Sequence, residues 1–382
     1  MPLLSPSARA LHALAPLRAD VSLGALRHNA RQMLTLAGGA EVMAAVKANA
    51  YGHGAIAVAQ ALVEAGIPRF SVANVLEGVA LRDAGIEAPI LVMGAALPEA
   101  LPAYARFGLD LTVTSPDGAE AAMQAARDGH ALTVHVKADT GMHRLGLDAD
   151  AAVEAVRQMT GAPGVTVAGL WTHFANVAGA FTDEQVARFD ALVARVEAEG
   201  IAVPPLLHLA NTGGLLATPA SVHGRQIVRA GGALYGLVSD RMLAGVADLR
   251  PVMRLVGRIV QVKVVAAGET VSYGRTWRAT EPTLIGTIGA GYGDGLPRAL
   301  SNRGRVGIGG ALFPVAGRVC MDMLMVDLGP PGGSGAGVRV GDEAVLFGPG
   351  GPSALDLADA AGTIAYDLTC RLTSRVPRVL VD

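Results

Sequence analysis

Eight short apolar segments alternate with helical patterns between residues 42 and 229, and this alternation constrains the fold more than any other feature. A strand-then-helix repeat over roughly 210 residues is typical of a (β/α)8 TIM-type barrel. A doubly wound open sheet is the alternative, which strand number does not exclude. The expected strands are 42–47, 69–73, 89–93, 109–114, 131–137, 165–172, 205–209 and 226–229, and the expected helices are 24–36, 56–65, 76–84, 98–107, 116–128, 150–159, 183–199 and 213–220.

The pattern changes after about Gly236. Residues 256–265 and 283–288 alternate apolar and polar side chains, and short β-like runs separated by Gly, Pro and Asp continue to Phe347. We therefore expect a second, mostly β domain with one short helix at 353–361. The predicted domains are 1–240 for the barrel and 241–382 for the β domain, with about the first 20 residues packing on the latter.

Composition excludes several classes of partner. The formal net charge is −2 and no run of Lys or Arg stands out, so a nucleic-acid partner is not expected. No apolar run is long enough for a membrane helix, and charged residues and Pro16 interrupt the N-terminal segment, which does not resemble a signal peptide. The two cysteines, Cys320 and Cys370, form no metal-type cluster, and no metal site is expected. We expect a soluble cytoplasmic protein.

Lys47 stands where the first barrel strand ends. The apolar run 42–46 precedes it, and a small, polar, glycine-containing segment follows. The C-terminal ends of parallel strands are where α/β enzymes carry their chemistry. A partly desolvated lysine amine loses its charge more easily and can form a Schiff base. The alternative is a lysine that extends from a strand end to solvent.

Polar clusters follow four further expected strands. Each alone is more often a cap or a turn than a catalytic group, but in a barrel they converge at one mouth together with Lys47. The mouth would be cationic and would suit an anionic ligand. The clusters are Lys137–Arg144, Thr172–Phe174, His208–Thr212 and Arg229–Gly232.

The segment KANAYGHG (47–54) resembles the cofactor-lysine motif of the alanine racemase family. Further segments resemble the same family in the same order, and the resemblance extends from about Ala19 to Arg378. They are KADTGMHRLG (137–146), THFA (172–175), HLANT (208–212), VRAGGALYG (228–236), VSYGRTW (271–277), GYGDGLPR (291–298), GRVCMD (317–322) and the segment around Tyr366.

The resemblance implies a pyridoxal 5'-phosphate enzyme in which Lys47 and Tyr273 are the two acid–base groups. Tyr273 would come from the partner subunit, which implies a homodimer with shared active sites. Arg144 and the Met321 backbone would bind the substrate carboxylate, with Lys137, which the family can carbamylate, and His208 in supporting positions. The implied cofactor-binding residues are Lys47, Tyr51, His173, Asn211, Thr212, Arg229, Gly232 and Tyr366.

The implied reaction is interconversion of L-alanine and D-alanine, supplying D-alanine for peptidoglycan. The same chemistry on serine, or on a broad range of amino acids, is the nearest alternative. A basic-amino-acid decarboxylase would carry an acidic residue at the pyridine nitrogen, so Arg229 argues against it. A non-catalytic cofactor-binding protein would need no second base, so Tyr273 argues against that.

Three positions depart from the family pattern. Ala230 stands where proline is usual, Asp367 where glutamate is usual, and Thr212 where serine is common. Thr212 keeps the hydroxyl group. None of the three changes removes a group implied in catalysis.

Overall fold

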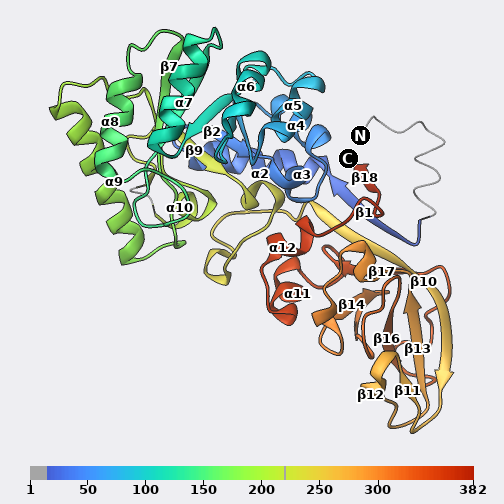
Figure 1. Ribbon diagram of the computed structural model, residues 1–382. Helices are drawn as coiled ribbons and strands as arrows, with labels where there is room; N and C mark the ends of the chain where they lie inside the picture. Colours follow the sequence, from blue (N-terminus) through green and yellow to red (C-terminus); the bar gives the residue numbers. More distant parts are fainter. Residues whose placement is uncertain (1–14, 219–220) are drawn as a thin grey trace.

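A closed barrel of eight parallel strands forms the first half of the protein, as the alternation predicts (Figure 1). The computed structural model describes residues 15–218 and 221–382, so the parts of the predictions that fall on residues 1–14, 219 and 220 lie outside the described residues. All eight expected strands are confirmed. They are β2 (Glu41–Ala45), β3 (Arg69–Val72), β4 (Ile90–Val92), β5 (Asp110–Val113), β6 (Leu132–Lys137), β7 (Val165–Trp171), β8 (Leu206–His208) and β9 (Ile227–Ala230).

Several of the barrel helices begin where a short polar side chain caps them. Asn74, Ser115 and Asp148 each accept a hydrogen bond from a backbone N–H of the first helical turn. These caps place each helix start beside the end of the preceding strand. The helices are α2 (Leu23–Leu36), α4 (Ala55–Glu64), α5 (Val75–Asp83), α6 (Leu101–Phe107), α7 (Pro116–Arg127), α8 (Ala149–Met159), α9 (Ala180–Ala198) and α10 (Thr212–Ala217).

The second domain is mostly β, as predicted. Its main sheet has the order β15-β14-β17-β10-β1-β18, and β13 pairs with both β10 and β16. The elements are β1 (Leu17–Ser22), β10 (Met253–Val265), β11 (Thr270–Val271), β12 (Trp277–Arg278), β13 (Thr283–Ile288), β14 (Arg305–Ile308), β15 (Ala311–Pro314), β16 (Leu324–Gly329), β17 (Glu343–Phe347), β18 (Arg378–Val381), α11 (Ala354–Ala361) and α12 (Ala365–Cys370). Sequence analysis missed α12 and β18.

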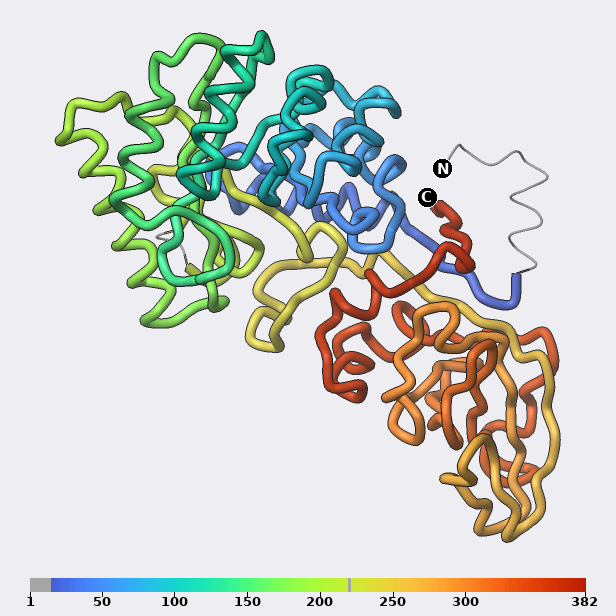
Figure 2. The backbone as a smooth tube through the Cα atoms, viewed as in Figure 1, coloured from blue at the N-terminus to red at the C-terminus, as the bar shows by residue number. Residues whose placement is uncertain are grey.

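The chain ends connect the two domains. β1 pairs with β10 antiparallel and with β18 parallel before the chain enters the barrel. Figure 2 shows the later crossing, where the segment after β9 leaves the barrel and runs into the long strand β10. The division at 240/241 stays a prediction. Each half has its own apolar core, one around the barrel strands and helices and one within the β domain.

The last segment of the β domain returns to the barrel. Arg378 Nε donates to the Gly52 carbonyl at 2.8 Å, and its other guanidinium nitrogens donate to carbonyls of residues 372, 373 and 376. This contact places α12, and with it Tyr366, beside the loop that follows Lys47. Among the described residues, no helix is both long and apolar enough to cross a membrane.

Candidate active site

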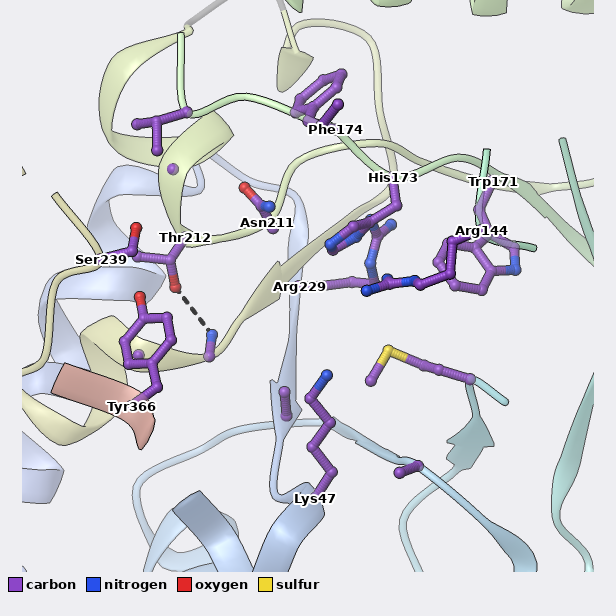
Figure 3. Close-up of a pocket in the computed structure, with 18 of the residues that line it drawn as sticks. Lys47, Arg144, Trp171, His173, Phe174, Asn211, Thr212, Arg229, Ser239 and Tyr366 are labelled. Carbon is purple, nitrogen blue, oxygen red and sulfur yellow. Dashed lines mark hydrogen bonds between the residues drawn. The ribbon is translucent and has the colours of Figure 1, made fainter. Parts of the chain in front are cut away.

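A cavity of about 460 Å³ opens at the C-terminal ends of the barrel strands. That volume lies within the usual range for small-molecule sites. Ten of the thirteen predicted site residues line it: Lys47, Tyr51, Lys137, Arg144, His173, Asn211, Thr212, Arg229, Gly232 and Tyr366. In Figure 3 the Lys47 amine points into the space between Tyr366 and Thr212 on one side and Arg144 and Arg229 on the other. The structure therefore brings most of the predicted site together.

A left-handed turn positions Lys47. The strand ends at Ala45, and residues 48–51 all have φ between 52° and 55°, although none is glycine. Each such residue costs about 1 kcal/mol or more, so the surroundings must hold the turn. Glu77 accepts the Ala48 N–H at 2.7 Å, and Asn49 accepts the Ala55 N–H at 2.9 Å. Sequence analysis predicted a loop here and extended the strand to Lys47, because only tertiary contacts select this conformation.

Burial and neighbouring cations weaken the charge on both lysines of the cavity. Desolvation lowers the pKa of Lys47, and the Arg144 guanidinium lowers it further. The same two causes, with Arg229 in addition, lower the pKa of Lys137 to about 8. A neutral amine is a nucleophile and a proton acceptor, so the cavity favours the chemically useful form of Lys47.

Trp171 forms an aromatic wall between two cations. Its ring lies 4.6 Å from Lys137 Nζ and 4.7 Å from Arg229 Cζ. Such contacts stabilise cations that have lost solvent. Sequence analysis missed this residue, although its place at the end of β7, directly before the Thr172–Phe174 cluster, was an available signal.

Arg229 is almost fully buried and is held by a dense set of acceptors. Nη1 donates to His208 Nδ1 at 2.9 Å, and Nη2 donates to the Thr172 and Leu209 carbonyls at 2.8 Å and to His173 Nδ1 at 3.3 Å. Burial lowers the pKa of Arg229 to about 9. Burial and the Arg229 charge also depress the pKa values of His208 and His173 well below 6.5, so both imidazoles are neutral acceptors. His208 lies behind Arg229 and does not line the cavity.

Hydroxyl groups and a glycine pair form the opposite wall. The Thr212 hydroxyl accepts the Gly231 N–H at 3.0 Å (Figure 3). A Cβ on Gly231 would lie 2.6 Å from the Tyr51 hydroxyl, and one on Gly232 would lie 2.3 Å from the Tyr366 hydroxyl. Only glycine permits these approaches. The three hydroxyls and the glycine backbone therefore form a compact polar cradle.

Asn211 and Ser239 complete this wall. Asn211 caps α10, accepting the Gly214 N–H at 2.9 Å. Ser239 lies beside Thr212 and Tyr366 in Figure 3 and was not predicted. It stands outside every segment that resembles the family and follows no strand, so the sequence carries no signal for it.

Tyr273 and Met321 are the two predicted residues that lie away from the cavity and in solvent. Both belong to the β domain, and Tyr273 lies between β11 and β12, at the end far from the barrel in Figure 1. Tyr273 is 69% exposed and Met321 is 53% exposed. Within one chain, neither contributes to the cavity.

The barrel, its appended β domain and a cationic cavity at the strand ends are the arrangement of a barrel enzyme. Residues 21–239 match the family model of the alanine racemase N-terminal domain, and residues 252–380 match that of the C-terminal domain. The alanine racemase of Chlorobaculum tepidum is 41% identical over 369 residues, covering 94% of each chain, and that of Carboxydothermus hydrogenoformans is 39% identical over 374 residues, covering 96% of this chain and 100% of its own.

Solved structures agree. The alanine racemase from Streptomyces coelicolor A3(2) superposes with a TM-score of 0.90 at 38% identity, covering 98% of this chain and 100% of that one. The alanine racemase from D-cycloserine-producing Streptomyces lavendulae gives a TM-score of 0.88 at 35% identity, covering 96% and 97%. The chain belongs to the alanine racemase family. It is an amino-acid racemase, as the resemblance predicted.

Proposed function

We propose that this protein interconverts L-alanine and D-alanine with pyridoxal 5'-phosphate and two acid–base groups, Lys47 and Tyr273, in a cytoplasmic homodimer. The product D-alanine would supply peptidoglycan synthesis. The observation that carries the proposal is Lys47, an amine with a lowered pKa that projects into a cavity lined by Lys137, Arg144 and Arg229.

The residues present fit the cofactor. The cradle of Thr212, Tyr51, Tyr366 and the glycine pair suits a phosphate group, which needs several donors and close backbone approach. Arg229 Nε is buried and has no hydrogen-bond partner among the described residues, so one donor remains for a ring nitrogen. Lys47, Tyr51, His173, Asn211, Thr212, Arg229, Gly232 and Tyr366 would hold the cofactor.

Bound pyridoxal phosphate supplies the electron-withdrawing ring that acidifies the α-proton of an amino acid. Arg229 would limit this electron withdrawal by the ring. A guanidinium is a donor only and stays protonated, so it would leave the ring nitrogen without a proton and favour racemisation over transamination.

Two proton carriers on opposite faces are needed to invert a carbon centre. Lys47 Nζ would exchange the α-proton on one face, and the Tyr273 hydroxyl of a second chain would exchange it on the other. Arg144, with Lys137 behind it, and the Met321 backbone N–H would hold the substrate carboxylate. The exposure of Tyr273 and Met321 in the single chain supports a site completed by a partner.

The test is racemisation by the purified protein with pyridoxal phosphate across a panel of L-amino acids, followed by chiral chromatography. We expect a strong preference for alanine. Comparable turnover of serine, lysine or arginine would keep the mechanism and change the substrate. Absence of turnover with the cofactor bound would contradict the proposal.

A further inference from the structure

Four polar side chains follow one another inside the barrel, from its mouth to its base, and all but the last pair are hydrogen-bonded. Arg229 Nη1 lies 2.9 Å from His208 Nδ1, and His208 Nε2 lies 3.0 Å from His135 Nδ1. His135 Nε2 lies 3.7 Å from the carboxylate of Asp110, at the start of β5. Both histidines are fully buried. Asp110 and His135 belong to none of the predicted site residues.

The donors and acceptors along this path fix where each proton sits. Arg229 can only donate, so His208 must accept at Nδ1 and carry its proton on Nε2. That N–H donates to His135 Nδ1, which must also be unprotonated. His135 therefore carries its single proton on Nε2, facing Asp110. A second proton on His135 would force His208 to accept at both nitrogens, which a neutral imidazole cannot do.

The path begins at a cation and ends at an anion. Among the described residues, no carboxylate pairs directly with Arg229, which is only 3% exposed. A buried charge is costly unless other groups compensate it. Asp110 is the carboxylate at the far end of the path, and the two neutral imidazoles orient their dipoles from Arg229 toward it. Within the described part of the chain His135 Nε2 is buried and has no hydrogen-bond partner, so the nearby Asp110 carboxylate is the charge that orients its N–H.

The barrel wall is shaped around these rings. A Cβ on Gly169 of β7 would lie 2.1 Å from His135 Nδ1, so only glycine leaves room for the imidazole. The pairing of β6 with β7 shifts register between Val134 and His135. Trp171 stacks on His208 with centroids 5.4 Å apart and planes 6° apart. The neighbouring strand thus holds both rings in place.

We propose that His135 and Asp110 are positioning residues: they hold His208 in the tautomer that accepts from Arg229, and so fix the guanidinium at the cavity wall, with an Nε that has no partner among the described residues. The inference rests on the proposed function, in which that Nε faces the ring nitrogen of the cofactor. Without these hydrogen bonds Arg229 could move. Its guanidinium would then no longer keep the ring nitrogen of the cofactor unprotonated. Transamination would then rise relative to racemisation.

The first test needs neither cofactor nor turnover. Histidine side chains labelled with 15N report which ring nitrogen carries a proton. In the wild-type protein we expect His208 and His135 both to be protonated at Nε2 and bare at Nδ1. A proton on Nδ1 of His208 would overturn the proposal without any variant.

Two variants of one position separate hydrogen bonding from packing. His135→Asn places an amide oxygen near the position of Nδ1 and can accept from His208, whereas His135→Leu places a methyl group there. We expect His135→Leu to raise the transamination-to-racemisation ratio about tenfold or more, the order expected for disturbing a hydrogen bond to a charged group. His135→Asn should stay within about threefold of wild type on the same grounds.

Asp110→Asn removes only the terminal charge from a partly exposed residue, so it tests the path if the His135 variants fail to fold. We expect the 15N and N–H shifts of His135 Nε2 to move, because its N–H loses the charge that it faces, and a smaller rise in the ratio. Met43→Leu, in the apolar layer of the same barrel interior, is the matched control. Equal effects of His135→Leu and His135→Asn, or unchanged spectra in Asp110→Asn, would overturn the proposal. A wild-type protein without racemisation would instead refute the proposed function.

Discussion

In the barrel, the side chains assigned to the reaction are buried around a cavity, whereas the β domain carries Tyr273 and Met321 on its surface. Four basic side chains line the barrel mouth, and one of them, Lys47, has a lowered pKa. The β domain exposes Tyr273, Tyr292, Met321 and Met323, each by more than 40%. Exposed apolar side chains are typical of an interaction surface where they form a contiguous patch. Under the proposed function, one chain would contain the cofactor half of a site and would present the other half to a second chain.

α12 qualifies this contrast. It belongs to the β domain in sequence, yet Tyr366 on it lines the barrel cavity of the same chain. The Arg378 contact with Gly52 holds the segment there. The β domain therefore contributes Tyr366 to the cavity of its own chain. In the proposed dimer it would contribute Tyr273 and Met321 to the site of the partner.

Lys47→Ala would remove the central group of the barrel half. We expect racemisation to fall by about 10⁴-fold or more, because in the proposed mechanism Nζ would be both the covalent anchor of the cofactor and one of two proton carriers. The visible absorbance of lysine-bound cofactor should disappear. Lys263→Ala, on the exposed part of β10, is the control. A Lys47→Ala protein that keeps the absorbance would remove Lys47 from this role.

Tyr273→Phe tests the exposed half. Turnover should fall about 10³-fold, within the usual contribution of an acid–base group, while cofactor absorbance and melting temperature stay unchanged. The residue is exposed, so its hydroxyl contributes little to the fold of one chain. Tyr104→Phe, in a buried barrel helix, provides a comparison for simple loss of a hydroxyl. Near-normal turnover of Tyr273→Phe would refute the second-base assignment.

Lys137→Met tests the cationic character of the mouth. The folded-state pKa of Lys137 is about 8, below its ordinary 10.5, so the unfolded chain binds more protons between these values. Wild-type stability should therefore rise with pH from about 8 to about 10.5, relative to the variant, by up to about 3 kcal/mol. Urea unfolding at several pH values measures the difference, with Lys263→Met as control. A parallel pH dependence in wild type and Lys137→Met would show that Lys137 is not desolvated.

Mixed dimers test whether the two acid–base groups of one site come from different chains. A chain with Lys47→Ala and a chain with Tyr273→Phe would together form one intact site per hybrid dimer. Random exchange of equal amounts should restore about a quarter of wild-type activity, because half of the dimers are hybrids and each has one working site of two. Subunit exchange is followed with differently tagged chains. Proven exchange without recovered activity would mean that Tyr273 does not act across subunits.

The sequence predicted the barrel because each strand and helix carries a local signal. Periodicity and caps such as Asn74 and Ser115 are encoded within a few residues. It missed β18 because Arg378–Val381 becomes a strand only by pairing with β1, more than 350 residues earlier. The short α12 has no strong periodicity of its own.

For the candidate site, the sequence determined which chemical groups follow the barrel strands, and the family resemblance added their expected roles. The tertiary structure decided the left-handed turn after Lys47, the aromatic wall of Trp171, and the path from Arg229 through His135 to Asp110. These features depend on contacts between residues on different strands, and a burial or a hydrogen bond of that kind has no local pattern along the chain. The sequence therefore specifies the groups and their order, whereas their pKa values, orientations and exposure come from the fold.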